Sequence, residues 1–163
     1  MQLAEIRTLF DHDAWATTKI LDQAAHLTAE QYAAPVGASG QSVGTTLTHM
    51  LMAYHLWRVR FETGATAFRL RPDDVSTLAA YREAWLEERR AFDAYLATLD
   101  DAALSQPMRY EGRGGKQAFT LWHVLLQLVS HSTQHRAELA EWLTAFGHSP
   151  GDLDFLFFVR QVE

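Results

Sequence analysis

Apolar residues recur every three or four positions through four long stretches of the chain. These stretches cover residues 3–27, about 43–62, about 77–99 and about 120–146. Such spacing places apolar side chains on one side of an α-helix and polar side chains on the other. No strand-like run of comparable length lies between them. The pattern therefore predicts four amphipathic helices that pack on one another.

Turn and capping residues separate the predicted helices. Ser42 and Ser76 are the expected N-caps of the second and third helices, and Gly64 is expected to end the second. Thr28 is expected to cap a short extra helical turn, since Gln31 follows it three positions later. Capping residues thus mark these predicted helix boundaries in the sequence.

Two shorter segments have weaker patterns. Residues 108–116 contain paired glycines, which permit a tight turn, so a small hairpin before the last long helix is possible. Pro150 and Asp152 are expected to begin a short terminal helix. We read residues 100–119 as otherwise irregular.

The predicted fold class is all-α, a four-helix bundle formed by a single domain over residues 1–163. The second and third helices are joined by the long linker 64–77. About 13 extended residues span roughly 40 Å, comparable to a helix of about 25 residues. Such a linker is long enough to carry the chain back along the bundle and to make those two helices parallel.

Composition narrows the function classes. The formal charge is −6 and the pI about 5.7, so no general basic field favours a nucleic-acid partner. The chain has no cysteine, which removes disulfides, thiolate metal ligands and a cysteine nucleophile together. Its first residues lack the apolar core of a signal peptide, and no run of about 18 apolar residues is present. We expect a cytoplasmic protein without membrane or nucleic-acid partners.

Two histidines stand four positions apart in the fourth predicted helix. Residues at this spacing lie one turn apart on nearly the same face, so His131 and His135 can reach a single metal ion. The apolar periodicity puts His135 in the buried seam with His131 beside it. The pair has an ordinary alternative, in which one ring is buried against a carbonyl group and the other is exposed.

A third histidine strengthens the metal hypothesis. His49 lies near the middle of the second helix, beside its apolar seam. If the second and fourth helices are neighbours, three neutral imidazoles meet one divalent ion and leave a coordination position open, as in catalytic zinc sites. No glutamate follows His131, so the His-Glu-x-x-His pattern of metalloproteases is absent.

The other histidines have plainer interpretations. His12 and Asp13 are expected to form a solvated or boundary pair, and His55 to be exposed, because it points about 120° away from the seam. His123 lies about 12 Å along the helix from His131, too far to share its metal, and is expected to be structural or to lie at a pocket edge.

Several motifs together resemble the DinB/YfiT-like superfamily, small metal-binding four-helix proteins. The resemblance covers essentially the whole chain. It rests on Trp15, on the segment from Ser42 to His49, on Gly112-Arg113, on the run Ser130-His131-x-x-x-His135-Arg136 and on the segment from Gly147 to Asp152.

The resemblance implies a metal site, a topology and an assembly. In that family, the histidines matching His49, His131 and His135 coordinate a divalent metal, commonly zinc or nickel. The implied topology is up-down-down-up, and homodimers are common. Many relatives continue His-Arg-Gly-Gln where this chain has Ala137 and Glu138, and many carry extra histidines at the positions of Gln127 and Gln134. These differences affect the surroundings of the metal and not the three ligand positions.

The resemblance also implies a reaction class. Characterised relatives include transferases that join bacillithiol or related low-molecular-weight thiols to an electrophile, which fits a cysteine-free chain. Two alternatives remain: a hydrolase acting through a water on the metal, and a stress-induced metal-binding or scaffold protein without turnover. The sequence identifies no catalytic residue or general base for either reaction.

Further side chains are candidates for the surroundings of the site. Arg136 either holds an acidic thiol or, as we prefer, forms a salt bridge with Asp152 or Asp154. Tyr54 and Trp57 are possible pocket residues with core packing as the favoured role. Gln127 and Glu138 complete this set.

Overall fold

The computed structural model describes residues 1–37, 40–67, 70–112 and 114–162, and it is mostly helical, as predicted. The long helices are α1 (Leu3–Ala24), α3 (Val43–Thr63), α4 (Leu78–Ala97) and α6 (Leu121–Ala145). The shorter elements are α2 (Ala29–Ala33), the 3-10 helix η1 (Pro72–Val75), α5 (Asp101–Leu104), β1 (Pro107–Gly112), β2 (Gly115–Thr120) and α7 (Phe155–Val162).

Side-chain caps begin the helices where the local sequence provides them. The Ser42 hydroxyl accepts from the Thr45 amide at 3.1 Å, and the Thr45 hydroxyl accepts from the Ser42 amide at 2.8 Å. Thr28 and Gln31 form the same reciprocal pair at the start of α2. Gly64 ends α3 with φ of 69°, a left-handed conformation that glycine adopts without steric cost.

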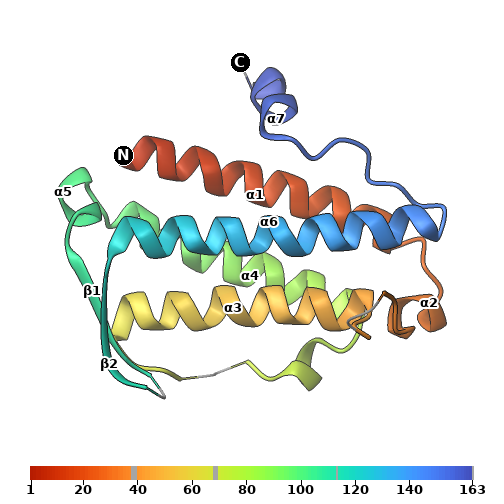
Figure 1. Cartoon of the computed structure of the whole chain (residues 1–163), viewed down its shortest axis with the longest axis horizontal. Coiled ribbons are helices and arrows are strands. Elements are labelled where there is room, and N and C mark those ends of the chain that lie inside the picture. The colour runs from red at the N-terminus through yellow and green to blue at the C-terminus, as the bar shows by residue number, and fades with distance from the viewer. Residues whose placement is uncertain (38–39, 68–69, 113, 163) are drawn as a thin grey trace.

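The four long helices lie side by side in Figure 1. Helix α1 contacts α4 and α6, and α3 likewise contacts α4 and α6. In Figure 1, α1 and α6 run from left to right, whereas α3 and α4 run from right to left. The connection through η1 returns along the lower edge of the molecule, and Val75 of η1 is buried.

One apolar core fills the space between these helices. Its largest fully buried aromatic side chains are Phe10 of α1, Tyr54 of α3, and Tyr81 and Phe92 of α4. Leu125, Leu128, Leu139 and Leu143 provide the contribution of α6. Since burial of large apolar side chains is the main favourable contribution to folding, this shared core fixes how α3 and α6 face each other.

A two-stranded antiparallel hairpin precedes α6, as the glycine pattern indicated. Strands β1 and β2 pair from Pro107 with Thr120 to Gly112 with Gly115. Arg113, part of the segment used for the family resemblance, lies outside the described residues. The hairpin lies at the end of the molecule where α6 begins (Figure 1).

Three predicted boundaries differ from the structure. The first helix ends at Ala24, because the amides of His26 and Leu27 bond carbonyl groups three residues back, in a tighter turn. The N-cap of α4 is Thr77 and not Ser76, as the Thr77 hydroxyl accepts from the Ala80 amide. The terminal helix begins only at Phe155.

Within the described residues, no helix has both the length and the apolar character needed to cross a membrane.

Candidate metal centre

Three histidines from two helices converge on one point. His49 lies two turns into α3, and His131 and His135 lie one turn apart on α6. The Nε2 atoms of His49 and His131 are 3.0 Å apart, and those of His131 and His135 are 3.2 Å apart. One nitrogen from each ring lies within 4.8 Å of the other two. The arrangement brings together the residues that the sequence singled out.

The spacing of these nitrogens fits a shared divalent ion. Two histidine nitrogens bound to tetrahedral zinc are about 3.3 Å apart, given zinc–nitrogen bonds of about 2.0–2.1 Å. The two short separations in the cluster are close to that value. The third pair of nitrogens, from His49 and His135, lies within 4.8 Å, so small side-chain rotations would bring all three nitrogens to one ion.

Hydrogen bonding alone does not satisfy all three rings. The His135 Nδ1 atom lies 2.9 Å from Glu138 Oε2, and a carboxylate only accepts, so Nδ1 carries the proton. The His135 Nε2 atom is then an unprotonated acceptor that faces the other rings. The His131 Nε2 atom either donates one hydrogen bond or accepts one, so it can form a well-directed hydrogen bond with only one of its two neighbours. A bound cation would remove this conflict, because it accepts a lone pair from each of the three ring nitrogens.

The surroundings favour the neutral rings that a metal needs. Partial desolvation of the ring lowers the pKa of His49, and the adjacent His135 lowers it further, although Glu138 acts in the opposite direction. Burial also lowers the pKa of His131, followed by the effects of His135 and His49. Since only an unprotonated imidazole binds a metal, both shifts keep ligand atoms available at lower pH than is usual for histidine.

The cluster borders a small hollow of about 280 Å³. Its lining residues are Gln41, Thr46, His49, His135 and Glu138. His49 is exposed, while His131 and His135 are half-buried, so the cluster lies at the rim of the bundle. His135 was expected in the buried seam and instead lies at its edge, because the core side of α6 faces both α1 and α3. The cluster is therefore open to small molecules.

The sequence model of the DinB family matches residues 1–162. The chain belongs to the DinB family. Its structure is similar to the crystal structure of a DinB-like protein from Bacillus cereus, with a TM-score of 0.64 and 16% sequence identity. That similarity covers 93% of this chain and 97% of the other, and it concerns the fold. No protein of curated function matches the sequence.

A buried ionic network lies next to the histidines in this DinB-family chain. Arg136 Nη1 donates to Asp13 Oδ1 and, at 2.6 Å, to the Ser132 hydroxyl. Tyr54 donates its hydroxyl proton to the other oxygen of Asp13. The pKa of Tyr54 is raised well above its ordinary value, first by burial and then by Asp13, which keeps this donor protonated. Every member of the network is bonded and removed from water.

Two sequence-based interpretations are corrected by this network. Arg136 pairs with Asp13 and not with Asp152 or Asp154. Asp13 is fully buried and His12 nearly so, which contradicts a solvated pair; the His12 ring bonds the Leu153 carbonyl at 2.8 Å. The helical spacing of Phe10, Asp13 and Thr17, all buried, is the signal that would have placed Asp13 inside.

The remaining candidates have the following positions. Tyr54 is a core residue, as preferred, and Trp57 packs against Phe61 and Tyr110 near the hairpin. Gln127 is exposed on α6 one turn before His131, and His123 is exposed with its ring against Trp122. Of the five residues proposed to surround the metal, Glu138 is the one bonded to a cluster histidine among the described contacts.

His55 was predicted to be exposed and is buried. Its Nδ1 atom lies 2.9 Å from Glu88 Oε2 on α4. Helix α3 packs against α4 as well as α6, so a side chain that points away from the α6 contact still meets another helix. This polar contact belongs to the interface between α3 and α4 and not to the histidine cluster.

Proposed function

We propose that this chain is a divalent-metal-binding protein, with zinc or nickel held by His49, His131 and His135 on an up-down-down-up four-helix bundle. We further propose a reaction class: metal-dependent transfer of a low-molecular-weight thiol of the bacillithiol type to an electrophile. The observation that carries the proposal is the convergence of three Nε2 atoms at 3.0 and 3.2 Å beside an open hollow.

The donor set supports thiol chemistry. Three neutral imidazoles leave the double positive charge of a bound ion uncompensated, so the ion lowers the pKa of a coordinated thiol or water. The Nδ1 proton of His135 is bonded to the Glu138 carboxylate, which leaves Nε2 of His135 as the nitrogen that would bind the metal. The cluster histidines themselves would serve as ligands and not as the attacking group.

The nucleophile has to come from outside the chain. The sequence contains no cysteine, so no protein thiol is available. The hollow beside the cluster provides hydrogen-bonding side chains, Gln41, Thr46 and Glu138, to position a small thiol. With an aryl chloride as electrophile, the sulfur–carbon bond forms and the carbon–chlorine bond breaks. Chloride leaves, and the thiol proton passes to solvent.

Hydrolysis is a second candidate, and the position of Glu138 favours it. Its carboxylate lines the same hollow as His49 and His135, where it is placed to take a proton from an attacking water. The sequence alone offered no general base for this reaction.

Metal analysis of the purified protein tests the site. We expect about one equivalent of zinc or nickel in the native protein and little in His49→Ala or His135→Ala. His123→Ala is the matched control, since His123 is an exposed histidine on the same helix as His135 and outside the cluster. Native metal content in both cluster variants would refute the site.

A second assay separates the reactions. Bacillithiol, mycothiol and glutathione are each supplied with 1-chloro-2,4-dinitrobenzene, and formation of the thioether is followed by absorbance. Transfer predicts acceleration by at least one thiol in metal-loaded protein and none in His135→Ala. If no thiol is consumed but ester substrates are cleaved, the hydrolase candidate holds. If neither reaction proceeds with these substrates, a metal-binding protein without turnover becomes the favoured candidate.

A further inference from the structure

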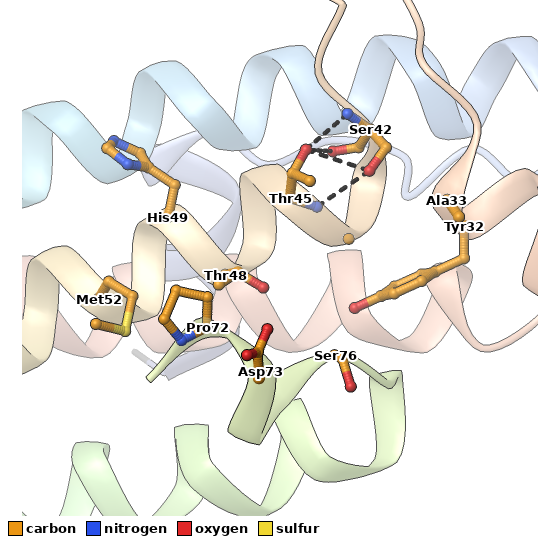
Figure 2. Close-up of a pocket in the computed structure, with 11 residues that line it drawn as sticks. Tyr32, Ala33, Ser42, Thr45, Thr48, His49, Met52, Pro72, Asp73 and Ser76 are labelled. Atoms are coloured by element: carbon orange, nitrogen blue, oxygen red, sulfur yellow. Dashed lines mark hydrogen bonds between the residues drawn. The ribbon is translucent and has the colours of Figure 1, made fainter. Parts of the chain in front are cut away.

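A larger groove lies between α3, α2 and η1. Its volume is about 510 Å³, within the range of pockets for small organic molecules. Figure 2 shows α3 above the groove and the segment containing Pro72 and Asp73 below it, with Tyr32 reaching in from α2. The lining residues are Tyr32, Ala33, Ser42, Gly44, Thr45, Thr48, His49, Met52, Pro72, Asp73 and Ser76.

The groove shares His49 with the histidine cluster but lies on the other side of α3 from the His49 ring. In Figure 2 the ring of His49 points away from Pro72 and Asp73 and toward α6. The Thr48 and Met52 side chains lie on the groove side of α3 in the same view. A molecule in the groove therefore meets the opposite side of α3 from the ring nitrogens that converge with His131 and His135.

A glycine gives the groove its shape. A Cβ atom at Gly44 would lie 2.6 Å from Cε1 of Tyr32, closer than side-chain atoms approach each other. The absence of a side chain lets the Tyr32 ring lie directly against the backbone of α3, where it forms one wall. Met52 and Pro72 add apolar surface on the other side. The result is a mostly apolar site with an aromatic face.

Asp73 is the one acidic residue among the described residues that line the groove, and the other polar groups are mainly hydroxyls. Asp73 makes no hydrogen bond or ion pair among the described residues, whereas its neighbour Asp74 is bonded to Arg71. Among the described residues that line the groove, none is a lysine or an arginine. The Tyr32 hydroxyl has no hydrogen-bond partner in the described part of the chain, and in Figure 2 it is directed toward Thr48 and Asp73.

We propose that this groove binds a small organic ammonium compound, whose apolar body packs on Tyr32, Met52 and Pro72 and whose charged nitrogen meets Asp73. An acidic ligand would place a second negative charge beside Asp73 in a protein that already carries a net charge of −6. A neutral apolar ligand would leave the unpaired carboxylate at the groove unused. Charge complementarity thus selects the ammonium.

Three probes of similar shape and different charge test the proposal. They are 2-phenylethylammonium, 2-phenylethanol and 3-phenylpropanoate, each titrated into isotope-labelled protein while amide NMR shifts are recorded. We expect the ammonium to bind and to shift amides of residues 44–52 and 72–76. The carboxylate probe is expected to bind about five-fold more weakly. This factor corresponds to about 1 kcal/mol, the upper end of the free energies of solvent-accessible charge pairs.

Variants locate the interaction. Asp73→Asn should weaken ammonium binding about five-fold, as expected for loss of one solvent-accessible ion pair. Glu87→Gln is the control, since it removes the same charge from an exposed position on α4. Thr48→Met projects a larger apolar side chain into the groove and should weaken binding of every probe.

The results also separate this inference from the metal site. His135→Ala is expected to lose metal but to keep its affinity for the ammonium probe, because the groove does not require the ion. Equal affinity for all three probes, an unchanged dissociation constant in Asp73→Asn, or shifts confined to residues outside the groove would each overturn the proposal. Absence of any shift up to the solubility limit of the ammonium would overturn it as well.

Discussion

Asp13 of α1 and Arg136 of α6 form an ion pair in the interior of the protein, with side chains 0% and 2% exposed. Arg136 directly follows His135 in the sequence, and Ser132, which also accepts from Arg136, directly follows His131. Because adjacent helical residues point about 100° apart, anchoring Ser132 and Arg136 toward α1 turns the two histidines toward α3. The buried pair thus sets the rotation of α6 that brings His131 and His135 to His49.

Replacement of one partner of this pair should be strongly destabilising. We expect Asp13→Asn to lower the free energy of unfolding by about 3–5 kcal/mol, since it leaves the Arg136 charge buried without compensation. Urea denaturation measures the change. Asp11→Asn is the control, because Asp11 pairs with Arg89 at 2.8 Å while its side chain stays 58% exposed; its loss should cost less than about 1 kcal/mol. Equal losses in the two variants would contradict the role assigned to burial.

Arg58 offers a second matched comparison. It donates to the buried Glu88 at 2.5 and 2.9 Å and to the more exposed Glu62 at 3.0 and 3.1 Å. Glu88→Gln disrupts the contacts of both Arg58 and His55 and should cost about 2–3 kcal/mol. Glu62→Gln, by contrast, should cost less than about 1 kcal/mol. Thermal denaturation of the two variants measures both losses of stability. The loss should be larger in Glu88→Gln than in Glu62→Gln.

The cluster histidines should make stability depend on pH. Partial desolvation lowers the pKa of His49 and His131, so the unfolded chain takes up protons near pH 6.5 that the folded chain does not yet bind. Stability contributed by these groups is therefore present above pH 6.5 and is lost as the pH falls below it. Denaturation of metal-free protein at pH 7.5 and 5.0 measures the loss, which should be smaller in a His49→Gln, His131→Gln variant. An identical loss in both proteins would assign the titration to other groups.

Glu138 should tune metal affinity without being a ligand. Without the contact to Glu138, the His135 ring can rotate and its proton can move from Nδ1 to Nε2. Glu138→Ala is therefore expected to weaken metal binding about 10- to 100-fold. Competition with a coloured chelator measures the affinity. Glu141→Ala is the control, since Glu141 is an exposed glutamate one turn further along α6. A similar affinity in native protein and Glu138→Ala would show that the 2.9 Å contact does not orient His135.

Local sequence was sufficient to predict what depends on local physics. Helical periodicity gave the four long helices to within a few residues, and Ser42, Thr28 and Gly64 act at the positions expected of capping residues. His131 and His135 were predicted to share a face because the four-residue spacing alone requires it. Their meeting with His49 further required α3 and α6 to be neighbours, which rested on the family resemblance.

Partners far apart in sequence could not be predicted in the same way. Arg136 bonds Asp13, 123 positions away, and many other acidic residues were equally compatible with the sequence. His55 is buried because α3 meets α4 on one side and α6 on another, so a side chain outside the main apolar seam is still covered. Both errors arise because each helix was assigned a single narrow buried face. A helix that packs between two neighbours buries a wider part of its surface.

The separation of the three cluster histidines along the chain bears on the order of folding. His49 and His131 are 82 positions apart, and the shortest segment that contains all three histidines runs from residue 49 to residue 135. A helix pair formed early from α3 and α4 has only one of the three nitrogens, so the ion finds its full set of ligands only after α6 has docked. In a refolding experiment, metal binding by the proposed site is therefore expected only once α6 has docked on α3, so metal uptake would report the formation of this helix interface.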